Sequence, residues 1–359
     1  MAAKLDIVPL NEWGFFHLPP RPCVIAGPCS AESEEQVMET ARGLKEIGIN
    51  VFRAGIWKPR THPGSFEGVG TEGLKWMQKV QKEYGMRVCT EVAGERHVFE
   101  CLKHGVDMVW IGARTTANPF LMQEIAEALR DTDMPVLVKN PVNPDIDLWI
   151  GALERLNAQG IKKIGVIHRG VSTPDKIKYR NSPQWEMAVE LHARYPELPV
   201  FADPSHMGGS RQYLAELSQR AMDLGFEGIM IESHCNPSCA LSDASQQLTP
   251  PDLIKLLESL VVRDASTEDE VFNDTLRQLR AQIDVLDENL IFTLASRMKV
   301  SRRIGEIKKT NSIAIVQPSR WDEVLERAEK TAEGYGLDKE FVKRIFNAIH
   351  EASVAEQNK

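Results

Sequence analysis

One pattern recurs along most of this chain: a short apolar run rich in Val and Ile, then a polar loop, then a segment long enough for a helix. Continuous apolar runs are typical of parallel strands buried on both faces. Eight such runs between residues 22 and 262 favour a closed (β/α)8 TIM barrel, with an open doubly wound sheet as the alternative. The predicted strands are Cys23–Ala26, Val51–Ala54, Arg87–Val92, Met108–Ala113, Pro135–Lys139, Ile164–His168, Pro199–Ala202 and Gly228–Glu232.

Helix-length segments separate these runs, as an α/β barrel requires. A length of 359 residues leaves room for a second, smaller domain. The predicted helices include Glu34–Ile47, Glu72–Tyr84, Pro119–Leu129, Trp149–Ala158, Gln184–Arg194, Gln212–Leu224 and Pro251–Leu260.

The pattern changes at residues 263–273, where the sequence RDASTEDEVFN is charged and poor in aliphatic residues. We interpret this stretch as a linker between a barrel domain, residues 1–262, and a tail, residues 274–359. The tail has no strand pattern, and its first part predicts one amphipathic helix to about Lys309, roughly 50 Å long. Apolar residues at spacings of three and four form its stripe: Leu276, Leu279, Ile283, Leu286 and Leu290.

Two shorter helices are predicted after the long one. Pro318 begins the first, which ends near Glu333, and Asp338 caps the second, which runs to about Glu356. The tail is therefore expected to be an all-α three-helix domain. Because two short helices cannot cover the whole stripe of a long one, we expect an intertwined homodimer of helices.

Composition narrows the function classes. A net charge of −8 argues against nucleic acid or an anionic membrane as partner. There is no apolar window long enough for a transmembrane helix and no signal-peptide pattern. The six scattered cysteines suit a reducing cytoplasm, and Cys235 and Cys239 are interpreted as plain thiols.

Chemically capable residues follow the predicted strands, at the end of a barrel where active sites lie. Six of them are cations, and cations that converge on one barrel mouth need anions to stabilise them. This set predicts a substrate with several negative charges, or two phosphorylated substrates. Its members are Arg53, Lys58, Arg60, Arg114, Lys139 and Arg169.

A second subset consists of a thiol, an imidazole and two carboxylates, which are all ligands of divalent metals. These residues belong to strands 1, 7 and 8, which are neighbours in a closed barrel, so they can converge. A mixed set of sulfur, nitrogen and oxygen favours Mn, Fe, Zn or Co over Mg. The four are Cys29, His206, Glu232 and Asp243.

Seven motifs at these strand ends resemble the type I-β family of 3-deoxy-D-arabino-heptulosonate 7-phosphate synthases, over about residues 1–262. The KPRT segment sets this family apart from the related 3-deoxy-octulosonate-phosphate and sialic-acid synthases. The motifs are GPCS at 27–30, RAGIWKPRTHPGSFEG at 53–68, GART at 112–115, VKNP at 138–141, HRG at 168–170, DPSH at 203–206 and IESH at 231–234.

The resemblance implies a metal-dependent condensation of phosphoenolpyruvate with erythrose 4-phosphate. By that match Cys29, His206, Glu232 and Asp243 bind the metal, with Mn2+ expected and Fe2+, Zn2+ or Co2+ as alternatives. Lys58 also becomes a candidate for proton transfer, and Glu91 for orienting a water or binding substrate. Phosphoenolpyruvate would be held by Arg53, Arg114, Lys139 and Arg169, and erythrose 4-phosphate by Lys58, Arg60 and Thr61.

The tail resembles the all-helical chorismate mutase family over roughly residues 270–357, through LRAQIDVLDENLIFTLASRMKVSRRIGEIK and ASVAEQ. The resemblance implies rearrangement of chorismate to prephenate in a site formed by Arg280, Arg297, Lys308, Arg320, Ser353 and Gln357. At 100° per residue, Arg297 and Lys308 share a helix face, whereas Arg280 points elsewhere. Arg280 is therefore expected to come from a partner chain.

One feature of the tail and one of the barrel leave an alternative open for the function of the tail. Gln317 and Trp321 stand where the best-known relatives carry acidic residues, and only about 20 residues precede the first strand. We expect a bifunctional enzyme whose barrel is inhibited by prephenate or chorismate. In the alternative, the tail is chiefly a regulatory ligand-binding module with little mutase activity.

Overall fold

Eight parallel strands form a closed barrel in the first part of the chain, which confirms the predicted barrel over the open sheet. The computed structural model describes residues 4–16, 22–58, 66–173, 177–262, 269–315 and 318–358. Neighbouring strands pair in sequence order, and β1 closes the ring on β8. The strands are β1 (Cys23–Gly27), β2 (Val51–Arg53), β3 (Arg87–Val92), β4 (Met108–Ile111), β5 (Val136–Lys139), β6 (Ile164–His168), β7 (Val200–Ala202) and β8 (Gly228–Glu232).

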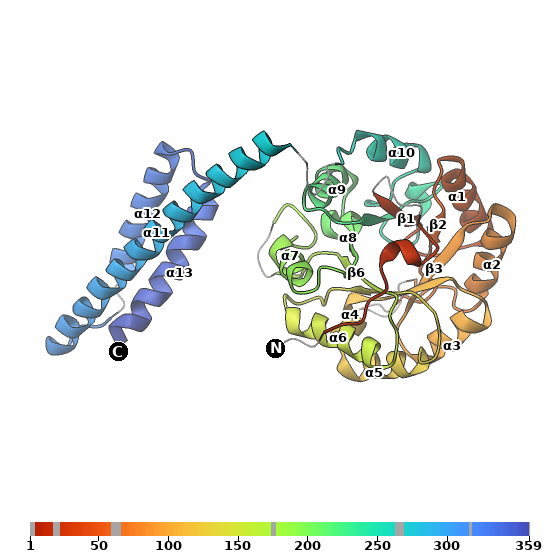
Figure 1. The fold of residues 1–359 in the computed structure, drawn as a ribbon, viewed down its shortest axis with the longest axis horizontal. Coiled ribbons are helices and arrows are strands. Elements are labelled where there is room, and N and C mark those ends of the chain that lie inside the picture. Colours follow the sequence, from red (N-terminus) through yellow and green to blue (C-terminus); the bar gives the residue numbers. More distant parts are fainter. Residues whose placement is uncertain are drawn as a thin grey trace. The chain divides into compact units, whose positions relative to one another are not determined.

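Helices surround the barrel as an outer ring (Figure 1). Among the differences from the prediction, α3, α4 and α8 were not predicted, and α6 begins three residues earlier because Asp145 caps it by accepting from Leu148 N. They are α1 (Glu34–Glu46), α2 (Glu72–Tyr84), α3 (Glu95–Lys103), α4 (Ala113–Thr116), α5 (Pro119–Ala128), α6 (Ile146–Ala158), α7 (Trp185–Arg194), α8 (Pro204–Gly208), α9 (Leu214–Asp223) and α10 (Pro250–Ser259), with 3-10 turns at Leu10–Glu12, Arg211–Tyr213 and Pro237–Cys239.

Side chains alternate between two apolar layers along each strand, because successive strand residues point to opposite faces. In β5, Val136 and Val138 pack outward against the helices, and Leu137 packs into the barrel interior. Leu10 and Trp13 of the N-terminal segment join that interior layer. The interior is thus a packed core, and this alternation decides which strand-end residues point into the barrel.

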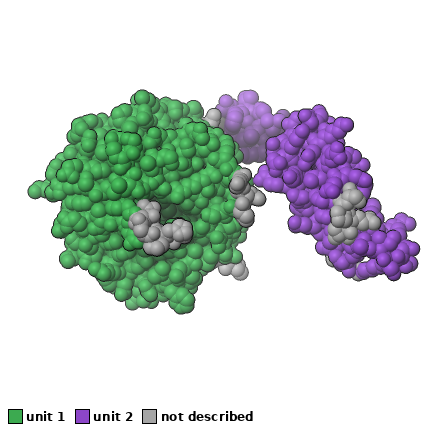
Figure 2. Space-filling model, turned by 180° about the vertical axis from the view of Figure 1, so that it is seen from behind, with its two compact units in different colours: residues 1–265 green, residues 266–359 purple. Residues whose placement is uncertain are grey.

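The chain divides into two compact units, residues 1–265 and 266–359 (Figure 2). The second unit consists of α11 (Glu270–Thr310), α12 (Pro318–Gly334) and α13 (Lys339–Asn358), which confirms the all-α three-helix tail. α13 packs along both α11 and α12. None of the described helices has an apolar stretch long enough to cross a bilayer.

The boundary of the long helix corrects the prediction. α11 begins at Glu270 rather than at Asp274, so the expected linker of residues 263–273 overlaps its first turn. Asp269 is the cause, since its carboxylate accepts a hydrogen bond from Phe272 N, 3.0 Å away, and caps the helix.

Candidate active sites of the two units

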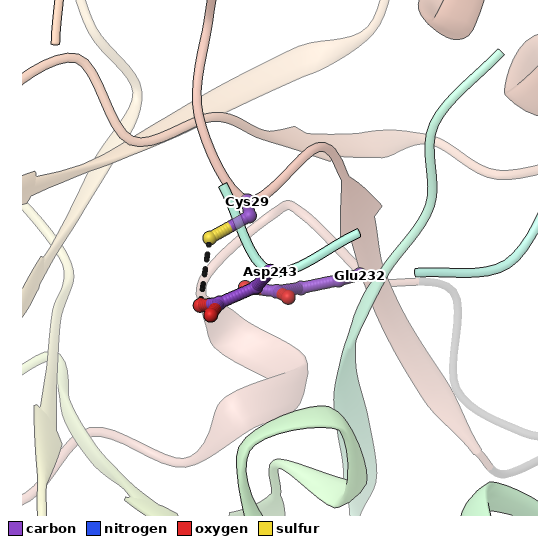
Figure 3. Close-up of side chains that lie close together, drawn as sticks. All are labelled: Cys29, Glu232 and Asp243. Atoms are coloured by element: carbon purple, nitrogen blue, oxygen red, sulfur yellow. Dashed lines mark hydrogen bonds between the residues drawn. The ribbon is translucent and has the colours of Figure 1, made fainter. Parts of the chain in front are cut away.

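Three of the four predicted metal ligands lie together at the barrel mouth. One ligand atom each of Cys29, Glu232 and Asp243 lies within 4.8 Å of the others (Figure 3). Cys29 follows β1, Glu232 ends β8, and Asp243 lies in the loop after β8. The Cys29 thiol donates to Asp243 Oδ2, 3.3 Å away. The closure of β1 on β8 brings these distant parts of the sequence together.

His206, the fourth predicted ligand, lies at the edge of this group. Its Nε2 is 3.7 Å from Glu232 Oε1, and its Nδ1 is 2.8 Å from Asp203 Oδ2. A carboxylate on Nδ1 favours the tautomer in which Nε2 has a free lone pair. His206 is therefore oriented toward the group, although it is not within the mutual distance of the other three.

Burial and nearby charges set the ionisation of these side chains. Burial, with the nearby charge of Glu232, raises the pKa of the Cys29 thiol to about 12. Burial also opposes ionisation of Asp243, but the charges of His206 and Arg180 lower its pKa to about 2. Glu232 Oε1 is buried without a hydrogen-bond partner. Sulfur, imidazole and carboxylate donors in this arrangement fit a divalent transition metal.

Strand alternation points Arg53, Lys139, Glu91 and Glu232 into the barrel, each at the C-terminal end of its strand. Arg53 and Lys139 are both buried near the ring of Trp110: the guanidinium carbon and the ammonium lie 4.7 Å and 5.8 Å from the ring centroid. Arg53 Nη2 is 3.4 Å from Glu232 Oε1, while its Nε and Nη1 are buried without a partner. Buried donors without an acceptor mark a place for an anion.

Arg114 and Arg169 extend the positive region. Burial, together with the charges of Arg180 and Arg114, lowers the pKa of Arg169 to about 10. Positive charges that lie near one another repel, and an anion between them would be stabilised. Arg53 and Lys139 thus lie together on Trp110 at the barrel mouth, and Arg169 lies close enough to Arg114 for their charges to interact.

Lys58 reaches the candidate metal ligands. Its Nζ donates to Cys29 Sγ, 3.1 Å away. Gly55 leaves room for the Lys58 side chain, because a Cβ at position 55 would lie 2.8 Å from Lys58 Cε. Arg60 and Thr61 lie outside the described residues.

Glu91 forms part of the wall of the mouth. Its Oε2 accepts from Trp110 Nε1, 3.0 Å away. The carboxylate fits over Gly112, where a Cβ would lie 2.2 Å from Glu91 Oε1. Glu91 thus has a fixed position beside the two cations on Trp110.

Sequence reasoning missed two polar residues of this site. Asp203 accepts from Lys139 Nζ, 2.7 Å away, and lies against His206. Asp203 directly follows β7, so the position after a predicted strand could have identified it. Arg180 donates to Asp243 Oδ1, 2.9 Å away, from a position twelve residues after the end of β6. No strand-end signal marks a residue so far along a loop.

The helical unit brings some predicted residues together. Arg297 on α11 donates to the hydroxyl of buried Ser353 on α13, and Ser353 donates to Ile349 O. Gln357 Oε1 is buried without a partner. Lys308 Nζ donates to Ile315 O, 2.5 Å away. Arg297 therefore faces α13, and Lys308 faces the loop after α11.

Arg280 and Arg320 have a different setting. Both are exposed, and Arg320 Nη1 is 2.7 Å from Glu323 Oε2. Arg280 precedes Arg297 by 17 residues on one helix, which is about 25 Å along the axis. Trp321 stacks on His350 with ring centroids 4.1 Å apart, whereas Gln317 lies outside the described residues.

Two families match this chain, one for each unit. Residues 19–268 match the DAHP synthetase I family, and residues 279–358 match chorismate mutase type II. A phospho-2-dehydro-3-deoxyheptonate aldolase of Thermotoga maritima is 38% identical over 225 residues, which cover 63% of this chain and 64% of that protein. This chain thus spans slightly less than two thirds of that relative's length.

More distant relatives and solved structures agree with the barrel match. A 2-dehydro-3-deoxyphosphooctonate aldolase of Legionella pneumophila is 29% identical over 265 residues, covering 67% of this chain and 91% of that protein. The crystal structure of the Thermotoga maritima DAHP synthase superposes with a TM-score of 0.59 at 35% identity, covering 66% of each chain. Its truncated form gives 0.57 at 33% identity, covering 66% of this chain and 83% of that chain.

Proposed function

This chain belongs to the DAHP synthetase I family and carries a chorismate mutase type II unit at its C-terminal end, and on that premise we propose that it is a bifunctional enzyme of aromatic biosynthesis. Its barrel would condense phosphoenolpyruvate with erythrose 4-phosphate to 3-deoxy-D-arabino-heptulosonate 7-phosphate. The observation that carries the proposal is that the Cys29, Glu232 and Asp243 group shares one barrel mouth with buried Arg53, whose Nε and Nη1 have no acceptor among the described residues.

The cations of the mouth would bind phosphoenolpyruvate. Arg53 and Lys139, buried on Trp110, suit its carboxylate, and Arg114 and Arg169 suit its phosphate. Guanidiniums match both groups with paired donors. They neutralise charge as the enol carbon bonds to the aldehyde carbon, water adds at the neighbouring carbon and phosphate leaves.

Cys29, His206, Glu232 and Asp243 would hold a divalent metal, for which we propose Mn2+, with Fe2+, Zn2+ or Co2+ as alternatives. When bound, the metal would polarise the aldehyde as a Lewis acid. Lys58 lies beside Cys29 and would donate a proton to the aldehyde oxygen as the new bond forms. Glu91 would orient the attacking water from its position over Gly112.

The test is phosphate release from phosphoenolpyruvate with erythrose 4-phosphate, before and after chelation and after addition of Mn2+. We expect activity to disappear with chelation, return with Mn2+, and be absent in Cys29→Ala. Full activity after thorough chelation would refute the metal site. Arabinose 5-phosphate is the matched alternative substrate, and a preference for it would place the barrel with the octulosonate-phosphate relatives instead.

The helical unit would rearrange chorismate to prephenate by holding the dianion in a reactive conformer. Arg297, Lys308, Arg320, Ser353 and Gln357 would come from one chain and Arg280 from its partner. The distance of about 25 Å between Arg280 and Arg297 along α11 supports a shared site, because one chain cannot bring both to one small ligand. Arg297→Ala should abolish chorismate turnover and leave barrel chemistry measurable.

Exposed apolar residues support the homodimer. Leu279, Ile283, Leu286 and Leu290 of α11 are between 51% and 66% exposed in the single chain. Between α12 and α13 lies an apolar groove whose lining includes Ala328, Ala332 and Phe346. A stripe and a groove of this kind would cover each other in a pair of chains.

We also propose that prephenate or chorismate inhibits the barrel through the helical unit. Fusion of a first pathway enzyme to a branch-point enzyme favours such feedback. Titration of each ligand into the full chain and into Arg297→Ala tests it: inhibition should disappear in the variant. Inhibition without measurable mutase activity in the parent chain would favour the alternative, a tail that is chiefly a regulatory module.

A further inference from the structure

The loop between β6 and α7 contacts more of the candidate active site than any strand-end prediction suggested. Its described residues 177–184 are hydrogen-bonded, through Arg180, to the loop after β8. Val171 N and Ser182 N each donate to the other residue's carbonyl oxygen at 2.8 Å, which closes the loop on itself. Arg180 N and Asn181 N donate to Gly208 O and Met207 O, which fastens it to α8.

Arg180 binds the carboxylate side of the candidate metal centre. Its Nη1 donates to Asp243 Oδ1, 2.9 Å away, and to Gln246 Oε1, 3.0 Å away. Gln246 in turn donates from Nε2 to Glu232 Oε2 at 2.7 Å. One guanidinium nitrogen therefore holds Asp243 directly and Glu232 through one amide.

Asp243 needs such a partner for two reasons. It has a positive φ of 49°, a backbone conformation that a non-glycine residue adopts only where surroundings hold it there. Its carboxylate also lies beside the Cys29 thiol and near the Glu232 carboxylate, and a neighbouring cation stabilises two carboxylates held this close. Arg180 supplies that charge from the solvent side, with its side chain about half exposed at 49%.

Asn181 links the same loop to the remaining parts of the site. It is buried, its Oδ1 accepts from Arg169 Nη1 at 2.9 Å, and its Nδ2 donates to His206 O at 2.6 Å. The loop thus joins the carboxylate ligands, the backbone of the histidine ligand and a cation of the phosphate region.

We propose that Arg180 is a positioning residue of the metal centre, which holds Asp243 and, through Gln246, Glu232 in the geometry that binds a divalent cation. This inference rests on the metal site of the proposed function. Residues that orient metal ligands typically contribute 10- to 100-fold in metal affinity. Arg180 touches no part of the substrates in this role, and its effect belongs to metal binding before any turnover.

The experiment measures Mn2+ affinity of the metal-free full chain, from the electron paramagnetic resonance signal of free Mn2+, without substrate. Arg180→Met should weaken Mn2+ binding by about 10- to 100-fold, and Arg180→Lys, which keeps a charged donor, should recover most of it. Lys178→Met is the matched control. It removes one positive charge from the same loop, where Lys178 binds Glu216, and should leave the affinity unchanged.

The outcomes separate this inference from the metal site itself. Equal Mn2+ affinity in Arg180→Met and the parent would overturn the positioning role and leave the metal site standing. Equal weakening in Lys178→Met would overturn it as well, because loop charge or loop stability would then be the cause. A parent chain that binds no Mn2+ would overturn both. Arg180→Gln, with circular dichroism of each variant, repeats the comparison with a smaller change of side chain.

Discussion

At the scale of single residues, the barrel mouth depends on small side chains as much as on charged ones. Gly112 has an ordinary extended backbone, with φ −73° and ψ 156°, so the backbone does not require glycine here. The lack of a side chain instead leaves space for Glu91. A methyl group there would lie 2.2 Å from Glu91 Oε1, and the flexible carboxylate would have to move. This gives a way to displace Glu91 without changing its chemistry.

Gly112→Ala should therefore lower barrel turnover at least tenfold while the stability of the barrel changes by no more than about 1 kcal/mol, in the range of a modest overpacking. Turnover and urea unfolding of the variant are the measurements. Gly151→Ala in α6 is the control, since a Cβ there meets nothing within 4 Å. Unaltered turnover in Gly112→Ala would remove Glu91 from the reaction.

His168 also ends a strand, but unlike Arg53 and Lys139 it does not point into the barrel. Alternation along β6 points it outward, where its ring packs between Trp149 and Trp185 and Nε2 donates to Pro183 O. Burial lowers the pKa of His168 to about 4, and its Nδ1 has no partner. The folded barrel therefore holds His168 neutral at pH values at which an unfolded chain would protonate it.

This predicts a loss of barrel stability in mild acid. Below the ordinary histidine pKa of about 6.5, His168 is protonated in the unfolded state but stays neutral in the folded state. The free energy of unfolding therefore falls as the pH is lowered to about 4, by up to about 3 kcal/mol. Urea unfolding between pH 7.5 and 4.5 measures it. His168→Gln keeps a donor toward Pro183 O and should flatten this part of the profile. Parallel profiles for the two chains would contradict the assignment.

At the scale of elements, the strands could be predicted because their apolar pattern repeats. Features that depend on a single contact could not be predicted. Buried parallel strands are continuous apolar runs, and the period of two separates inward Arg53 and Lys139 from outward His168. The start of α11 depended on one cap, Asp269, and the place of Arg180 depended on how one loop crosses the mouth. Neither has a periodic signal.

The packing of α13 on α11 depends on one glycine. A Cβ on Gly305 would lie 2.5 Å from Gln357 O and 2.6 Å from its Cα, and backbone cannot move aside as a side-chain end can. Close approach here brings the end of α13, with Gln357, onto the face of α11 that carries Arg297.

Gly305→Ala should push the end of α13 away and cost about 1–3 kcal/mol of stability in the helical unit. Chorismate turnover should fall at least tenfold, and barrel turnover should be kept. Gly334→Ala is the matched control, because a Cβ at the end of α12 meets nothing within 4 Å. If both variants keep full mutase activity, the packing of Gln357 is irrelevant to the site.

At the scale of the whole molecule, the proposed dimer depends on the apolar surface of the helical unit. Large apolar side chains of α11 remain exposed, and Leu286 is 66% exposed although it belongs to the predicted stripe. Each exposed Leu would contribute roughly 1.5–3 kcal/mol on full burial. Pairing the stripes of two chains would therefore stabilise the dimer by several such contributions.

Leu286→Arg should convert the proposed dimer into monomers, since a charge in the centre of an apolar interface leaves an unpaired buried ion. Mass from light scattering at several concentrations measures the assembly. Because Arg280 would no longer reach the Arg297 of another chain, chorismate turnover should be lost with the dimer, while Mn2+ affinity of the barrel should be unchanged. A monomeric variant with normal mutase activity would show that one chain completes the site, and a parent chain that is monomeric at every concentration would contradict the shared site directly.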